Sequence, residues 1–135
     1  MRVVLDTNVL ISGILFSGPP NEIIKGWRDG IIQFVLSPEI IDEYFRVSKI
    51  LAERYPSVEI GLILKLIIAR SETIQAPPLT HQICEDPDDD KFFTCALRGE
   101  SKIIISGDKH LLKLSGYRGI TVLAPRAFVE QYLKK

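Results

Sequence analysis

The sequence of 135 residues contains few cysteines and no excess of charge of either sign. Its two cysteines, Cys84 and Cys95, do not form a C-x-x-C pair, so we expect two free thiols in a reducing compartment. Lys and Arg number 17, and Asp and Glu number 17, so no overall positive field points to nucleic acid. Lys65 interrupts the longest apolar run, which leaves no stretch long enough to span a membrane.

A secretory signal and internal repeats are also missing from the sequence. Asp6 and Asn8 interrupt the apolar stretch that a signal peptide would need near the N-terminus. Hydrophobic residues make up 46% of the chain, which is enough for one domain with a core. We therefore expect residues 1–135 to form a single domain of a soluble, cytoplasmic protein with no membrane segment.

Strand and helix patterns alternate along the chain. Apolar runs without polar alternation predict strands at 3–5, 31–36, 103–105 and 119–123, and residues 72–76 resemble a short edge strand. Helical spacing predicts helices near 9–16, 21–29, 38–51, 58–69, 92–98, 109–114 and 125–133. This order is typical of an α/β fold, in which an open parallel sheet carries helices on both faces.

Two aspartates lie just after predicted buried strands. Asp6 directly follows Val3–Leu5, and Asp108 follows the 103–105 strand after Ser106 and Gly107. In open α/β sheets the carboxyl ends of the strands are where ligands bind. The alternative for each aspartate is that it only caps the helix that follows it.

Two further acids are placed by helical phase. At about 100° per residue, Glu43 lies beside the apolar stripe of the 38–51 helix, whereas Asp42 points away from it. The alternative for Glu43 is an ion pair with Arg46 or Lys49. Asp89 falls on the same face as the apolar side chains of the next helix. Its neighbours differ, since Asp90 points away and Asp88 lies to one side.

These four carboxylates are able to meet at one end of the sheet. Such a cluster repels itself unless a cation lies within it. A set of oxygen ligands without histidine or thiolate suits Mg²⁺ or Mn²⁺. The sequence therefore predicts a metal site made by Asp6, Glu43, Asp89 and Asp108.

Four segments resemble, in order and over essentially the whole chain, the PIN-domain ribonucleases, and in particular the VapC-like toxins of prokaryotic toxin–antitoxin pairs. They are LDTNVLIS at 5–12, PEIIDE at 38–43, DPDDDKF at 86–92 and IISGD at 104–108. The resemblance implies a three-layer α/β/α sandwich and a metal-dependent endonuclease for single-stranded RNA. It also implies a homodimer that an antitoxin protein inhibits.

The resemblance assigns the acidic site to the same four residues and places Ser106 where the family has a small hydroxyl residue. We expect the carboxylates to hold one or two Mg²⁺ or Mn²⁺ ions, with Asp108 completing the pocket. Asn8 and Ser106 are expected to support carboxylates or phosphate by hydrogen bonds. The candidate phosphate contacts are Lys91, Lys109 and Lys113.

The 58–69 helix is apolar on nearly every face, so it is either enclosed in the core or packed against a second copy of the chain, and we expect a homodimer. In such a dimer, Arg46, Lys49 and Arg54 are candidates to line a basic groove. His81 and His110 are expected at the surface or in packing.

Other functions remain open. A receiver domain also gathers acids around Mg²⁺, but its loop and lysine are not found in the needed order. A haloacid-dehalogenase phosphatase needs a second aspartate at position 8, where this chain has Asn8. A protein of another class keeps the fold without catalysis and acts by binding RNA or a partner.

Overall fold

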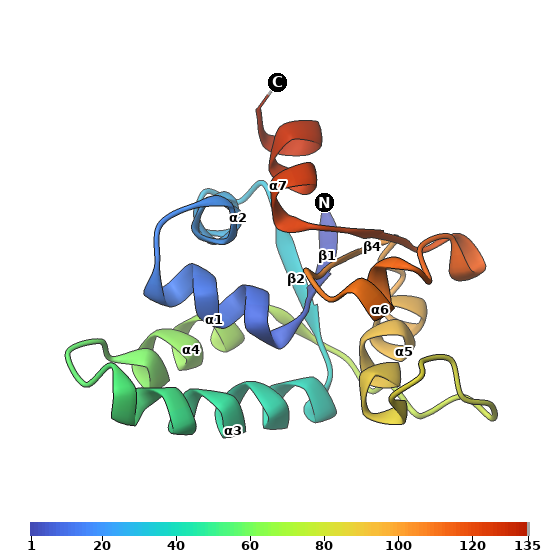
Figure 1. The fold of residues 1–135 in the computed structure, drawn as a ribbon, viewed down its shortest axis with the longest axis horizontal. Coiled ribbons are helices and arrows are strands. Elements are labelled where there is room, and N and C mark those ends of the chain that lie inside the picture. Colours follow the sequence, from blue (N-terminus) through green and yellow to red (C-terminus); the bar gives the residue numbers. More distant parts are fainter. Residues whose placement is uncertain (135) are drawn as a thin grey trace.

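A computed structural model describes residues 1–134, in which five parallel strands form one sheet in the order β3-β2-β1-β4-β5 (Figure 1). The strands are β1 (Arg2–Leu5), β2 (Gln33–Leu36), β3 (Glu72–Thr73), β4 (Ile103–Ile105) and β5 (Thr121–Leu123). Val3 and Val4 of the central strand are fully buried, as expected for a strand that is covered on both faces. The predicted parallel α/β sheet is therefore confirmed.

Helices cover the sheet on both sides, which makes three layers (Figure 1). They are α1 (Thr7–Leu15), α2 (Pro19–Arg28), α3 (Pro38–Arg54), α4 (Ile60–Ala69), α5 (Asp90–Arg98), α6 (Lys109–Leu112) and α7 (Pro125–Phe128). Shorter turns are η1 (Pro87–Asp89), η2 (Tyr117–Gly119) and η3 (Val129–Leu133). Helix α5 packs on β1, β2 and β4, whereas α1 packs on α2, α3 and α4, away from α5. No helix within residues 1–134 is long and apolar enough to cross a membrane.

Several boundaries differ from those that the sequence predicts. The edge strand near 72–76 is only two residues long, although Ile74 N still donates to Leu36 O at 2.8 Å. The helix expected over 58–69 begins at Ile60. The last helix is α-helical only to Phe128 and continues as the π-helical turn η3, in which Lys134 N donates to Val129 O at 3.0 Å.

The strand order places a crevice at the carboxyl ends of β1 and β4. The chain moves outward from β1 to β2 and β3, and then returns to the other side of β1 as β4. Connections on the two sides of this switch point leave in opposite directions, which opens the crevice where α/β proteins bind ligands. The backbone N–H of Asp6 donates to Ile105 O at 3.0 Å, so the two strand ends are tied directly.

Helix α3 is fixed to the same place. Ser37 caps the helix by accepting from Ile40 N at 3.4 Å, and Pro38 occupies its first turn, as the sequence predicts. The buried Tyr44 hydroxyl donates to Leu5 O at 2.6 Å. This bond joins the residue after Glu43 to the residue before Asp6, so it sets the position of one acid relative to the other.

We predict that Tyr44→Phe lowers the free energy of unfolding by about 1 kcal/mol, because a buried hydrogen bond is lost while the ring still fills its space. Chemical denaturation measures this change. The matched control is Tyr55→Phe, since the half-buried Tyr55 ring packs edge-on against Phe16. Equal stability losses in the two variants would show that the hydroxyl bond has no such role.

Candidate active site

Asp6 lies at the bottom of the crevice, at the end of β1. It is 8% exposed, and one of its oxygens accepts a hydrogen bond of 2.6 Å from the Ser106 hydroxyl. Burial raises the pKa of Asp6, the Ser106 bond partly offsets this, and the charges of Glu43 and Asp108 raise it further. Asp6 occupies the N-cap position of α1, but its side chain makes no capping hydrogen bond there, so helix capping does not account for its carboxylate.

Asp108 reaches the crevice from the loop after β4. Its backbone N–H donates to the fully buried Ser106 hydroxyl at 3.0 Å, so Ser106 connects Asp108 to Asp6. One Asp108 oxygen accepts from His110 N at 2.8 Å and caps α6. The capping interpretation is therefore right for Asp108, and the half-exposed carboxylate still lines the crevice.

Glu43 comes from α3 and is held by side chains of two other elements. One of its oxygens accepts from the buried Thr7 hydroxyl. The other lies 2.6 Å from Lys91 Nζ and 3.6 Å from an Arg46 nitrogen. The Glu43 side chain is 12% exposed, whereas Asp42 is exposed, as the helical phase predicts. The ion-pair alternative was right for Arg46, but Lys91 is the nearer partner and Lys49 is not involved.

The expected role of Lys91 needs correction. Its side chain is 12% exposed and also lies 3.2 Å from Asp88 Oδ2, so it is not a free phosphate contact at the mouth. Burial lowers the pKa of Lys91, but its hydrogen bonds to Glu43 and Asp88 outweigh burial and leave the pKa raised. The ammonium is therefore a charged part of the acidic cluster. Lys109 and Lys113 are exposed, in line with a role at the surface.

Asp89 ends the η1 turn and faces the other acids. Partial burial raises its pKa to about 6, and the charges of Asp86, Asp6, Asp108 and Glu43 add to this in that order. These four charges act on Asp89 because the structure brings them close to it. The prediction that Asp89 is the inward-facing member of the triple aspartate is consistent with this environment.

The neighbours of Asp89 have other partners. Asp90 accepts from Ile83 N at 3.0 Å and from Cys84 N at 2.7 Å, so it fastens the loop before η1. The sequence predicted only that Asp90 points away from the apolar face of its helix, and this description was incomplete. Asp88 is 64% exposed and pairs with Lys91.

Two hollows meet at Asp108. One of about 420 Å³ contains Asp6 and Asn8, and another of about 350 Å³ contains Asp86 and Asp89. Asn8 is exposed at the mouth of the first hollow. The two hollows share Asp108, so Asp6, Asp86, Asp89 and Asp108 line one acidic crevice, whereas Glu43 lines neither hollow.

The donor set of this crevice fits a hard divalent cation, because it consists of carboxylate oxygens, and burial together with neighbouring negative charge raises the pKa of Asp6 and of Asp89. The Lys91 ammonium already occupies the place beside Glu43 that a metal ion would take. Among residues 1–134, no three His, Cys, Asp or Glu side chains stand close enough together to hold one ion. Binding therefore requires side chains to move inward, and Glu43 must first share or lose its lysine.

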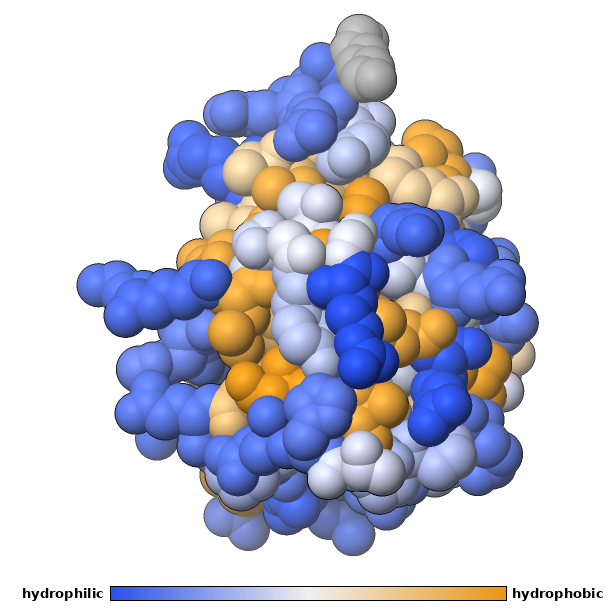
Figure 2. All heavy atoms as spheres, turned by 90° about the vertical axis from the view of Figure 1, so that its right-hand side faces the viewer, coloured by the Kyte–Doolittle hydropathy of each residue, from blue (hydrophilic) through white to orange (hydrophobic). Residues whose placement is uncertain are grey.

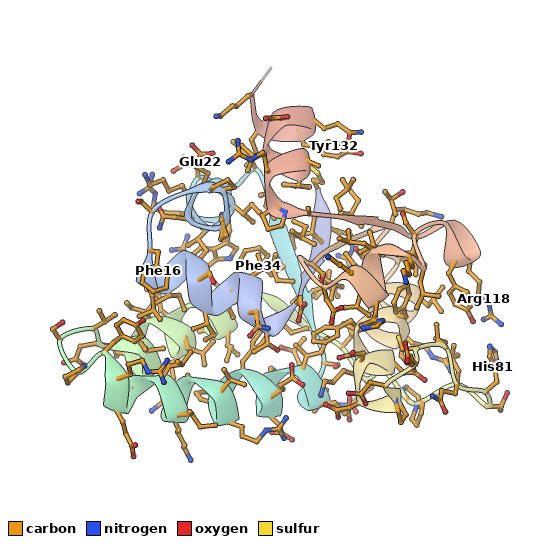
Figure 3. The ribbon with its side chains drawn as sticks, viewed as in Figure 1. Phe16, Glu22, Phe34, His81, Arg118 and Tyr132 are labelled. Carbon is orange, nitrogen blue, oxygen red and sulfur yellow. The ribbon has the colours of Figure 1, made fainter. Side chains whose placement is uncertain are left out.

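The two histidines lie at the surface. His110 is exposed and its Nδ1 lies 3.1 Å from Glu85. His81 is 3.0 Å from the Tyr117 hydroxyl, which joins the loop before η1 to the η2 turn. His81 and Arg118 project from these loops at the right of Figure 3. Figure 2 views this side and shows hydrophilic side chains interspersed with apolar areas. The expected surface role of the histidines is confirmed.

Sequence reasoning missed two residues that shape the site. Thr7 was passed over in favour of Asn8, although its hydroxyl is the group that reaches Glu43. After burial, the charge of Asp86 contributes most to the raised pKa of Asp89, and Asp86 also caps η1 by accepting from Asp88 N at 2.9 Å. The signal available for Asp86 was its place before Pro87, a common start for a helical turn.

Comparison with known proteins agrees with the α/β fold. Residues 2–110 match the family model described as PIN domain. The chain is 33% identical over 146 residues to the uncharacterized protein MJ1680 of Methanocaldococcus jannaschii, a match that covers 99% of this chain and 93% of that protein. PIN domains are usually nucleases, and these typically use divalent metal ions. The chain belongs to the PIN domain family.

Proposed function

We propose that this protein is a Mg²⁺- or Mn²⁺-dependent endoribonuclease that cleaves single-stranded RNA, and that residues 1–135 act as one nuclease domain. Burial raises the pKa of Asp6 and of Asp89, and neighbouring acids raise both further: Glu43 and Asp108 act on Asp6, and Asp86, Asp6, Asp108 and Glu43 act on Asp89. This concentration of negative charge at the β1/β4 switch point is the observation that carries the proposal. An acidic crevice repels the RNA backbone unless cations neutralise it, so its charge makes sense as a metal site.

Asp6, Asp89 and Asp108 would hold the metal, and Glu43 would join them when it turns from Lys91. A bound divalent ion supplies a nucleophile from water at neutral pH and neutralises charge on the phosphate. Ser106 keeps Asp6 oriented through its 2.6 Å bond, and Thr7 does the same for Glu43. Asn8 stands at the mouth of the crevice, where its amide would contact phosphate.

Positive charge for the RNA backbone lies near the crevice. Lys109 directly follows Asp108, and Lys113 lies just beyond the end of α6. Both are exposed, so their ammonium groups are free to move to phosphates beside the acids. These contacts would position the strand without reading its sequence.

The biological role that we propose is that of a VapC-like toxin held in check by an antitoxin protein in the cytoplasm. The four motifs of the family resemblance support the toxin assignment. Cys84 and Cys95 are buried free thiols, which suits a reducing compartment.

We also propose a homodimer formed through α4. On this helix Ile60, Leu64 and Ile67 are buried, but Leu62 and Leu66 are 65% and 54% exposed. Ile50, on the neighbouring α3, is 66% exposed. Arg46, Lys49 and Arg54 on α3 are exposed as well, so a dimer of this kind has basic residues available for a groove.

A second candidate function is a catalytically silent PIN module that binds RNA or a partner. The observation that favours it is the occupation of Glu43 by Lys91 and Thr7, which leaves the carboxylates apart. The two functions differ in one measurable property, which is metal-dependent cleavage.

We predict that the purified protein cleaves single-stranded RNA in the presence of Mn²⁺ and not in the presence of EDTA. Asp6→Asn should reduce the cleavage rate by more than about 100-fold, because the loss of a metal ligand costs at least as much as the loss of an outer-shell partner. Gel analysis of a labelled RNA measures cleavage. The matched control is Asp42→Asn, which removes an exposed carboxylate beside Glu43 and should keep the rate. RNA that stays intact with the wild type but is retained in a binding assay would favour the silent module.

We predict opposite behaviour for neighbouring aspartates. Asp89→Asn should abolish metal-dependent cleavage, whereas Asp88→Asn and Asp90→Asn should keep much of it. Folding raises the pKa of Asp89 from 3.8 to about 6, so the metal-free protein loses stability as pH rises through this range. Asp89→Asn should therefore be more stable than the wild type at pH 7.5, and this gain should shrink at pH 5.

Thermal melts in EDTA at the two pH values and RNA cleavage with Mn²⁺ test this pair of expectations. A dead Asp90→Asn variant alongside an active Asp89→Asn variant would show that the assignment is displaced by one residue.

For the dimer, we predict that Leu62→Glu with Leu66→Glu gives a monomer, because both side chains are exposed and their change places charges in the interface. Light scattering at micromolar concentration measures the mass. Ile31→Glu is the matched control, since Ile31 is 52% exposed and lies outside α4, so this variant should stay dimeric. A monomeric wild type would refute the dimer.

A further inference from the structure

Lys91 stands out because its largely buried ammonium pairs with Glu43, an acid whose charge acts on both Asp6 and Asp89. It is the second residue of α5, and its side chain is 12% exposed. Its Nζ lies 2.6 Å from Glu43 Oε1 and 3.2 Å from Asp88 Oδ2. Two carboxylates of different exposure thus share one cation, since the Asp88 side chain is 64% exposed.

Both oxygens of Glu43 are already in use by groups of the chain itself. Thr7 donates to Oε2, and Lys91 faces Oε1. Arg46 also approaches Oε1, but it stands at 3.6 Å and its side chain is 62% exposed, so solvent weakens its interaction. A divalent ion that reaches Glu43 therefore meets an oxygen that an ammonium already holds.

We propose that Lys91 is a resident cation that competes with the divalent metal for Glu43 and so sets the metal affinity of the site. The inference rests on the proposed function, because it requires that this crevice binds a divalent ion. In the metal-free protein Lys91 is a positioning residue, which keeps the buried Glu43 carboxylate paired and in place. When metal binds, the ammonium gives up Glu43.

Asp88 provides the second position for the displaced ammonium. It sits one helical turn before Lys91 at the solvent edge, within 3.2 Å of the same Nζ. The flexible lysine stem lets the head move between the two carboxylates. The exchange therefore leaves no buried charge without a partner. A buried charge without a partner would be strongly destabilising.

The experiment measures metal binding and stability in the absence of RNA. Calorimetric titration with Mn²⁺ should show that Lys91→Met binds the ion about tenfold or more tightly than the wild type, because the competitor is gone. In EDTA the same variant should melt at a lower temperature, since Glu43 has lost its closest counter-charge. Lys91→Arg keeps the charge and should keep the weaker affinity.

Arg46→Gln is the matched control, because it removes an exposed cation from the same Glu43 oxygen. It should change the Mn²⁺ affinity by less than about twofold. Glu43→Gln provides the second test. In that background Lys91→Met should lose most of its gain in affinity, because there is no longer a carboxylate to compete for. If Lys91→Met does not fold, Lys91→Gln, which retains a hydrogen-bond donor, replaces it.

The outcomes separate this inference from the proposed function. A wild type that binds Mn²⁺ with a Lys91→Met variant that binds equally or less tightly would overturn the competition while the metal site stands. A gain that survives unchanged with Glu43→Gln would also overturn it, because Lys91 would then act on the whole crevice and not through Glu43. If neither wild type nor variant binds Mn²⁺, the metal site falls and the inference falls with it.

Discussion

Electrostatic repulsion among Asp6, Glu43, Asp89 and Asp108 is the constraint that the groups around these carboxylates must offset. Three of these acids have partners that reduce its cost: Ser106 for Asp6, Lys91 with Thr7 for Glu43, and a helix start for Asp108. Partial burial among like charges raises the pKa of Asp89 to about 6. The protein thus maintains an acidic crevice that a cation would stabilise.

The fold brings these acids together from four separate segments. The return of the chain from β3 to β4 places Asp6 and Asp108 at one switch point. The Tyr44 hydroxyl fixes α3 to the end of β1, so Glu43 arrives beside Asp6. The η1 turn carries Asp89, and the start of α5, which packs on β1, β2 and β4, carries Lys91. Stability and site geometry therefore depend on the same buried contacts.

Local pattern was sufficient to predict the parallel sheet. An unbroken apolar strand followed by aspartate identified Asp6 and Asp108, and helical phase separated Glu43 from Asp42. Partners distant in the chain were not predictable in this way. Lys91 lies 48 positions from Glu43, and the residues next to it in the sequence do not indicate that its side chain reaches Glu43. The bonds from Asp90 to Ile83 and Cys84 depend likewise on the path of a loop that has no periodic pattern.

The location of a bound ion tests the central claim most directly. A crystal of the protein grown with Mn²⁺ and measured at the manganese absorption edge identifies the ion by its anomalous scattering. We expect a peak in the crevice that marks an ion bound by Asp6 and by at least one of Asp89 and Asp108. An ordered crevice without such a peak at saturating Mn²⁺, or a peak bound only by acids outside this set, would contradict it.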